Sequence, residues 1–253
     1  MKIYFVDTSK PGIINFGNMG VRNFLISYYY ERESGGGLID TVRENFDNAK
    51  IFLDSGAYSA MTQNTTINLD EYIEFCRVNQ DKVDLMANLD ILGNGEASKE
   101  SYDKMTDAGI NVLPCYHLGE DYDLLKYYCK KADYVAIGGQ VGLKFKLREL
   151  YNYFQNVFDI IPKEKKVHLF GVTNFKLMMR YMSRITSVDS SIVSRRSAYN
   201  NSLSYSGIPT NTKAIPTRIN QEQVKALQEY AVTRILNIEK EINEMQELKI
   251  GQI

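Results

Sequence analysis

The sequence contains no tryptophan, five prolines, two histidines and three cysteines in 253 residues. The cysteines are Cys76, Cys115 and Cys129, an odd number with no Cys-x-x-Cys spacing. Small exported domains rely on an even set of paired cysteines, and structural zinc sites rely on clustered ones. The pattern therefore indicates neither a disulfide framework nor a clustered zinc site, and it predicts reduced, buried thiols.

Long apolar runs are also missing. No stretch of about 18 uncharged apolar residues occurs, although a membrane-spanning helix would need one. The first residues, MKIYFVDTSK, carry charge too early for the apolar core of a signal peptide. We therefore expect a cytoplasmic protein that makes no membrane contact.

Neither sign of charge is in excess. The chain has 30 Lys and Arg against 31 Asp and Glu, a formal net charge of -1. This balance excludes a protein coated in basic surface, but a local groove could still hold a phosphate backbone. Net charge therefore leaves nucleic-acid binding undecided.

Strand-like and helix-like segments alternate along the chain. The strand-like segments are residues 2–7, 50–55, 83–90, 111–117, 134–139, 166–172 and 185–191. The helix-like segments between them are residues 69–80, 97–109, 121–132, 147–161 and 174–184. Alternation predicts a parallel sheet with right-handed crossovers, and the length suits one (β/α)8 TIM-like barrel. An eighth strand is not obvious, and we expect it at residues 205–216 or an irregular barrel.

Two segments depart from this alternation. Residues 8–50 are rich in glycine and contain the run Tyr28–Tyr30, which indicates an elaborated first βα unit. Residues 190–216 form a polar segment expected to be a loop, and residues 217–250 read as one long amphipathic helix. The apolar stripe of that helix must cover the barrel or a second copy of the chain, so a homodimer stays open. We expect residues 1–253 to form a single domain.

Acidic residues, a histidine and glycines end the predicted strands. Because the carboxyl ends of barrel strands share one rim, these residues should form one polar site suited to a flat heterocycle. Asp54, in FLDSGAYS, and Asp90 have plain alternatives as a helix cap and the start of a turn. His117 also ends a strand, whereas His168 lies within one and is expected to be a packed, hydrogen-bonded core residue. The other strand-end residues are Gly138, Gly139, Gly171 and Asp189.

Together these motifs resemble the guanine transglycosylases, which exchange guanine in nucleic acid for a 7-deazaguanine. FLDSGAYS resembles the DSGG-F signature, with Ala57 and Tyr58 in place of the second glycine and the phenylalanine. YVAIGGQVG resembles the base-binding loop, and HLFGVTNFKLMMRYMSRITSVDSS resembles the segment leading to the nucleophilic aspartate. The order and rough spacing match over residues 50–191. The SVDSS ending is more similar to the 7-deazaguanine transglycosylases of phages and bacterial DNA-modification clusters than to the tRNA enzymes.

The resemblance implies a role for each aligned residue. Asp189 would be the nucleophile that attacks C1′ of the target nucleoside, and Asp54 would protonate the leaving base. Asp90 would accept hydrogen bonds from the amino and ring N–H edge of the base. The other residues of the implied substrate site are Ser55, Gly56, Tyr58, His117, Gly138, Gly139 and Gly171. Arg195 and Arg196 could hold phosphate, although a solvated charge pair explains them equally well.

The sequence departs from the tRNA enzymes in one respect. Those enzymes carry a Cys-x-Cys-x-x-Cys zinc cluster after the nucleophile strand, but here no cysteine follows Cys129. We therefore expect DNA rather than tRNA as the polymer, and the mechanism demands no organic cofactor or metal. Three alternatives stay open: a zinc-less tRNA enzyme, a non-catalytic subunit that pairs through residues 218–249, and an unrelated phosphosugar barrel. The presence of both Asp54 and Asp189 argues against a non-catalytic subunit.

Overall fold

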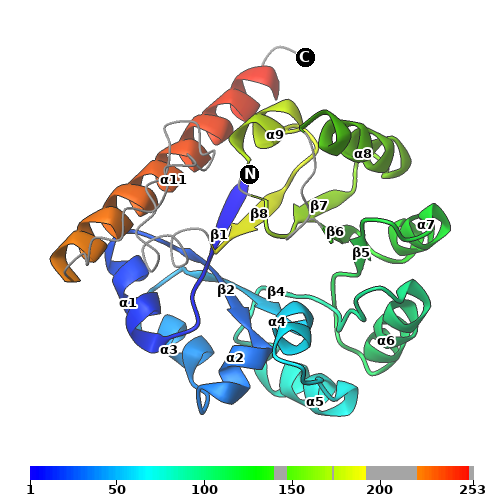
Figure 1. Cartoon of the computed structure of the whole chain (residues 1–253), viewed down its shortest axis with the longest axis horizontal. Helices are drawn as coiled ribbons and strands as arrows, with labels where there is room; N and C mark the ends of the chain where they lie inside the picture. The colour runs from blue at the N-terminus through cyan, green and yellow to red at the C-terminus, as the bar shows by residue number, and fades with distance from the viewer. Residues whose placement is uncertain (140–146, 173, 192–220, 251–253) are drawn as a thin grey trace.

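The fold is α/β, with one eight-stranded, all-parallel sheet that curls upon itself inside a ring of helices (Figure 1). The computed structural model describes residues 1–139, 147–172, 174–191 and 221–250. The strands are β1 (Lys2–Val6), β2 (Asn23–Ser27), β3 (Lys50–Asp54), β4 (Leu85–Met86), β5 (Cys115–His117), β6 (Tyr134–Gly138), β7 (Lys166–Leu169) and β8 (Ser187–Ser190). Their order in the sheet is β4-β3-β2-β1-β8-β7-β6-β5.

At least one helix connects each pair of successive strands, as the alternating sequence pattern predicts. Those that come before β8 are α1 (Lys10–Asn18), α2 (Tyr28–Glu33), α3 (Leu38–Asn45), α4 (Ala57–Thr62), α5 (Leu69–Asn79), α6 (Gly95–Asp107), α7 (Tyr122–Lys131), α8 (Leu147–Ile160) and α9 (Phe175–Arg180). Helix α11 (Gln221–Ile250) follows β8. The polar segment expected at 190–216 lies almost entirely outside the described residues.

The expected barrel is not closed by a continuous ladder. Its edge strands β4 and β5 are joined only by an isolated bridge between Ala87 and Leu113. Pro114 comes next and has no N–H to donate. The N–H of Cys115 then donates to the side-chain oxygen of Asn88, at 2.9 Å, instead of to a backbone carbonyl. The sheet is therefore TIM-like in its curl and order, but pairing between its two edges stops after one bridge.

The strand missing from the seven predicted ones is β2. It lies within residues 8–50, the segment expected to elaborate the first βα unit. Five residue pairs align β2 with β3, from Asn23 with Lys50 to Ser27 with Asp54. Helix α2 begins at Tyr28, directly after the strand, so no turn residues separate the two elements. The strand pattern of NFLIS merges with the tyrosine run for this reason, and sequence reasoning missed it. The expected alternative at 205–216 lies outside the described residues.

Two separate apolar cores follow from the alternation of side chains along each strand. The larger core lies between the sheet and the helices and includes Phe5 and Leu53. The smaller core contains only residues of the strands and of the segments beside them, so it fills the inside of the curl. Its buried members are Tyr4, Leu25, Phe52, Ala87 and Leu113. Residues two positions beyond this inner layer therefore reach the rim at the carboxyl ends of the strands.

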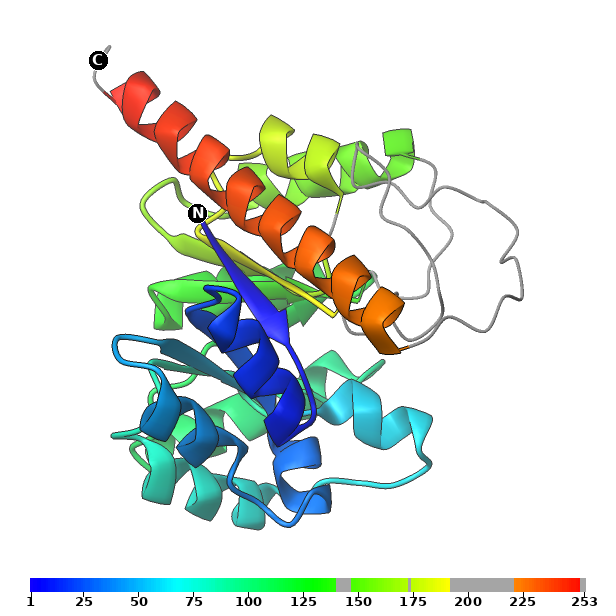
Figure 2. The same ribbon diagram turned by 90° about the vertical axis from the view of Figure 1, so that its left-hand side faces the viewer.

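Helix α11 packs along the side of the sheet near β1 (Figure 2). Of its predicted apolar stripe, Ala231, Ile235, Ile238 and Ile242 are buried in the larger core. The carboxylate of Glu239 accepts hydrogen bonds from the backbone N–H of Ile3 and from the Asn23 side chain, both at 3.1 Å. This part of the stripe is thus covered within the chain. None of the helices in the described part of the chain is long and apolar enough to span a membrane.

Candidate functional site

The candidate site continues the inner layers of the curled sheet. On β3, Asp54 follows the inner-core residue Phe52 by two positions, so both side chains take the same face. By the same alternation His117 shares a face with Cys115 on β5, and Asp189 shares one with Ser187 on β8. The strand-end residues predicted from sequence therefore lie at one end of the sheet.

Asp54 is a carboxyl group poised to exchange a proton near neutral pH. Burial, followed by the nearby carboxylates of Asp90 and Asp189, raises the pKa of Asp54 to about 7. Its Oδ2 accepts a hydrogen bond from the backbone N–H of Gly56 at 3.0 Å, which opposes the shift. A group with such a pKa can both donate and accept a proton, as general acid/base catalysis requires.

Gly56 allows the backbone to turn immediately after Asp54. Its φ is +79°, in the left-handed region that side chains rarely adopt. A Cβ at this position would lie 2.4 Å from Ser27 Oγ and 2.5 Å from Tyr29 Cβ. The turn that orients Asp54 therefore requires glycine.

Asp189 is 7% exposed and is held by a backbone amide. Its Oδ1 accepts a hydrogen bond from the N–H of Gly171 at 2.7 Å. Gly171 has a φ of +66°, so this segment after β7 also needs a left-handed residue at the point where it meets the carboxylate. Asp189 is thus fixed in orientation by the neighbouring strand end.

A chain of buried polar groups runs beneath Asp189. The hydroxyls of Tyr134 and Ser187 lie 2.6 Å apart, and Ser187 Oγ lies 2.6 Å from His168 Nδ1. On the other side of the ring, His168 Nε2 lies 3.4 Å from Asp189 Oδ1. Burial lowers the pKa of His168 even though Asp189 opposes the shift, so the ring is neutral. With the proton on Nε2, the ring turns its N–H side toward the carboxylate, although the two atoms do not meet the geometry of a hydrogen bond.

His168 also belongs to the inner core, as predicted for a packed, hydrogen-bonded residue. It is 0% exposed, and its ring centroid lies 4.5 Å from that of Phe170 and 4.7 Å from that of Phe52. The packing keeps the imidazole in one position beneath the rim. What sequence reasoning missed is its contact with Asp189, since the pairing of β7 with β8 creates that contact.

Asp90 follows β4 and joins two parts of the rim. Its Oδ1 accepts a hydrogen bond from Ser55 Oγ at 3.2 Å, and its Oδ2 lies 2.9 Å from His117 Nε2. Ser55 is fully buried and also accepts a hydrogen bond from the N–H of Ala57 at 3.3 Å. Asp90 is therefore tied to its neighbours by side chains, whereas Asp189 is held by a backbone amide.

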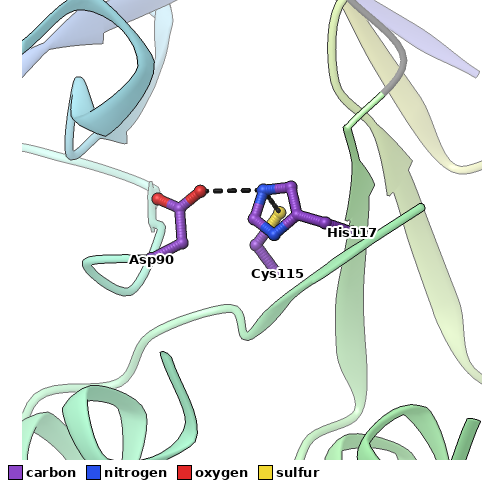
Figure 3. A group of neighbouring side chains, drawn as sticks. All are labelled: Asp90, Cys115 and His117. Carbon is purple, nitrogen blue, oxygen red and sulfur yellow. Dashed lines mark hydrogen bonds and ion pairs between the residues drawn. The ribbon is translucent and has the colours of Figure 1, made fainter. Parts of the chain in front are cut away.

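His117 stands at the centre of a second cluster, drawn in Figure 3 with Asp90 and Cys115. Its Nε2 lies 3.5 Å from Cys115 Sγ, and its Nδ1 lies 3.6 Å from Glu120 Oε1. Burial alone would lower the pKa of His117, but Cys115, Asp90 and Glu120 together raise it. Burial raises the pKa of the Cys115 thiol to about 11, with His117 opposing the shift. Asp90, Cys115 and His117 offer three ligand atoms within 4.8 Å of one another.

The remaining predicted residues differ in how they relate to these clusters. Gly138 and Gly139 lie beside His117, where a Cβ on Gly138 would come within 3.0 Å of His117 Nε2. Tyr58 is 40% exposed on α4. Arg195 and Arg196 lie outside the described residues.

A cavity of about 650 Å³ opens beside His117 and is separate from the pair Asp54 and Asp189. Its lining includes Lys99, Glu120 and Tyr127, so charges of both signs face it. The cavity therefore borders the β5 side of the rim.

Two functional candidates that sequence reasoning missed, Cys115 and Glu120, lie beside the predicted residue His117. Cys115 and His117 are separated by one residue at the end of a strand, a spacing that puts both side chains on one face. Glu120 follows three residues later and accepts the His117 backbone N–H at 2.7 Å. The spacing between cysteines alone does not reveal the group that Cys115 forms with His117 and Glu120.

No protein-family model matches the chain, and no curated protein matches it.

Proposed function

We propose that this protein is a base-exchange transglycosylase that replaces guanine in a nucleic acid, preferentially DNA, by a 7-deazaguanine base. The observation that carries the proposal is the pair Asp54 and Asp189, two carboxyl groups near enough that Asp189 helps raise the pKa of Asp54 to about 7. Glycosyl transfer through a covalent intermediate uses two carboxyl groups, one as the nucleophile and one as the acid/base.

The proposed reaction has two balanced steps. In the first, a carboxylate oxygen of Asp189 attacks C1′, the bond from C1′ to N9 of guanine breaks, and Asp54 gives its proton to the departing base. In the second, Asp54 takes the N9 proton of the incoming base, whose N9 attacks C1′ and releases the ester to Asp189. Asp54 is protonated again at the end, so the cycle needs no external acid or base.

The surroundings of Asp189 support its role as the nucleophile. The Gly171 N–H and the neutral His168 ring orient one oxygen, Oδ1, from below and from the side. Because neither contact delivers a full positive charge, the carboxylate is oriented without strong ion pairing. An oriented nucleophile lowers the entropic part of the barrier.

Base recognition would fall to Asp90. Guanine and 7-deazaguanines both present adjacent N–H donors on one edge, and a carboxylate is the acceptor that fits that edge. Ser55 and His117 hold the two Asp90 oxygens from different sides, which fixes the plane of the carboxylate. In a duplex, C1′ of a stacked nucleotide is not open to attack from the side opposite the base, so the target must be flipped out.

The test is incorporation of a labelled 7-deazaguanine base into polymer. The full chain is incubated with guanine-containing DNA or with tRNA in separate reactions, and label retained in the polymer is counted. We expect incorporation into DNA that is lost in Asp189→Ala and in Asp54→Ala. Asp133→Ala is the matched control, because that carboxylate is 99% exposed beside Lys165, away from the rim.

The outcomes separate the parts of the proposal. Labelling of tRNA alone would overturn the choice of DNA and keep the two-carboxylate chemistry. Labelling of neither polymer by a folded wild-type protein would overturn the proposed activity. Denaturation during turnover adds an independent readout, since wild type should carry a covalent protein–polymer adduct that Asp189→Ala lacks.

A further inference from the structure

We propose that Asp90, Cys115 and His117 form a binding site for a divalent cation of the zinc class. The ligand atoms are a carboxylate oxygen, a thiolate sulfur and an imidazole nitrogen, a donor set typical of zinc and unsuited to magnesium or calcium. Three protein ligands leave a fourth position for water or for a donor atom of a substrate.

Two of the three distances between ligand atoms lie near those of tetrahedral coordination. Zn–S bonds of about 2.3 Å and Zn–N bonds of about 2.0–2.1 Å put sulfur and nitrogen about 3.5 Å apart in a tetrahedron. Cys115 Sγ and His117 Nε2 lie 3.5 Å apart. Nitrogen and oxygen would be about 3.3 Å apart in the same geometry, and His117 Nε2 and Asp90 Oδ2 lie 2.9 Å apart. The sulfur and the Asp90 oxygen lie within 4.8 Å of each other, against about 3.6 Å in the same geometry. A cation would therefore draw the Asp90 carboxylate toward Cys115.

A carboxylate stands behind the histidine, as it does in many zinc sites. Metal-bound histidines commonly direct their second ring nitrogen at a carboxylate, which fixes the tautomer and the ring plane. His117 Nδ1 faces Glu120 Oε1 at 3.6 Å, and both atoms are buried without a hydrogen-bond partner. Glu120 is itself held by the His117 backbone N–H through its other oxygen. His117 is thus oriented to present Nε2 toward Asp90 and Cys115.

The backbone around the cluster is built to admit these side chains. The Asn88 side chain fixes the N–H of Cys115, where pairing between β4 and β5 stops. On the neighbouring strand, a Cβ at Gly138 would lie 3.0 Å from His117 Nε2 and 3.1 Å from Cys115 Sγ. Glycine at this position leaves the two ligand atoms room to converge.

This inference does not rest on the proposed function. Asp90 has two oxygens, and Oδ2 is the one that faces His117 while Oδ1 faces Ser55. A cation bound through Oδ2 would leave Oδ1 directed toward Ser55. Metal binding and base exchange can therefore be measured separately. A negative result for one does not decide the other.

The experiment uses the full chain, stripped with a chelator and then incubated with Zn²⁺ alone. After desalting, bound zinc is measured by mass spectrometry, and a parallel sample with Co²⁺ is examined for thiolate-to-cobalt charge-transfer absorption. We expect one equivalent of metal and a thiolate band. Cys115→Ser should lose the band and weaken zinc affinity at least tenfold, and Glu120→Gln should weaken it by about 10–100-fold.

The double variant Cys76→Ser/Cys129→Ser is the matched control, since it leaves Cys115 as the only thiol in the chain. Retention of the thiolate band in this variant assigns the ligand to Cys115 even if Cys115→Ser does not fold. Substoichiometric zinc in the wild type, or loss of the band in the double variant while circular dichroism shows it folded, would overturn the site.

Discussion

The two histidines of the chain both contact carboxylates near the rim, yet their environments are opposite. His168 is enclosed by aromatic rings, and burial lowers its pKa. His117 is surrounded by Cys115, Asp90 and Glu120, which raise its pKa against the effect of burial. Polar and acidic neighbours raise the pKa of one buried histidine, whereas an apolar layer lowers that of the other.

This contrast divides the rim into two halves with different chemistry. On the β7–β8 side, backbone N–H and a neutral ring orient Asp189 and leave its negative charge largely uncompensated. On the β4–β5 side, His117 binds Asp90 directly at 2.9 Å. Asp54 lies near both carboxylates, because each of them contributes to its raised pKa. Neighbouring carboxylates of one site are thus held in different ways by the groups around them.

Neutralising each carboxylate in turn tests whether the two halves of the rim differ in function. Asp189→Asn should lower the rate of base exchange by about a thousandfold or more, because the amide cannot form the ester intermediate. Asp90→Asn should raise KM for the incoming base more than it lowers kcat. Steady-state incorporation kinetics measure both. Equal effects on kcat in the two variants would remove the proposed division of labour.

The pH dependence of stability tests whether burial and the two neighbouring carboxylates raise the pKa of Asp54. A carboxyl group whose folded pKa is about 7, against an unfolded value of 3.8, stabilises the fold when protonated, and this contribution is lost as pH rises from about 4 to 7. Asparagine does not ionise, so Asp54→Asn removes this pH-dependent loss of stability. Between pH 5 and pH 8, we expect the unfolding free energy of the variant to rise by on the order of 2 kcal/mol relative to that of wild type. Urea unfolding at both pH values measures it, and an unchanged difference would contradict the shift.

Replacing the histidines compares the two halves directly. His168→Gln should lower kcat by about 10–100-fold with little change in KM, because the ring orients Asp189 without touching the base. His117→Gln should act mainly on KM through Asp90. The matched measurement is kcat and KM for both variants over a pH series in the presence of a chelator. A His168→Gln protein that loses stability but keeps kcat would show that the ring serves packing alone.

The smallest expected effects come from the glycines that shape each half. Gly138→Ala adds a Cβ within 3.1 Å of Cys115 Sγ and His117 Nε2 and should cost about 1–3 kcal/mol of unfolding free energy. Gly171→Ala forces a side chain onto a φ of +66° and should cost about 1 kcal/mol. Chemical denaturation measures both. If Gly138→Ala leaves the unfolding free energy unchanged, Cys115 Sγ and His117 Nε2 are not constrained by β6.

Much of the fold was predictable because the alternation of strands and helices is local. The helices expected at 69–80, 97–109, 121–132, 147–161 and 174–184 are confirmed as α5 to α9, within a few residues, although α9 ends early at Arg180. The strand β2 was not predictable in this way, since Ser27 passes directly into a tyrosine-rich helix. Nor was the unclosed edge, which depends on the lack of an N–H at Pro114 and on the Asn88 side chain accepting the N–H of Cys115.

The strand-end rule also brought the principal acids together in advance. Asp54, Asp90 and Asp189 each follow an apolar strand, and parallel strands end at one rim. The side chains that surround these acids could not be predicted in the same way. Ser187 lies under His168, and Glu120 lies behind His117, because of register and packing between segments distant in sequence or across a turn.

The sequence by itself determined the alternating architecture, the parallel direction of the strands and the rim on which the acids gather, because these depend on periodicity within short segments. The tertiary structure sets which histidine has its pKa lowered and which has it raised, how far the sheet closes, and which side chains converge as a candidate metal site. Those properties depend on burial and on distances of a few ångströms between different strands. Periodicity sets the face on which a residue lies, but only the assembled sheet sets its neighbours.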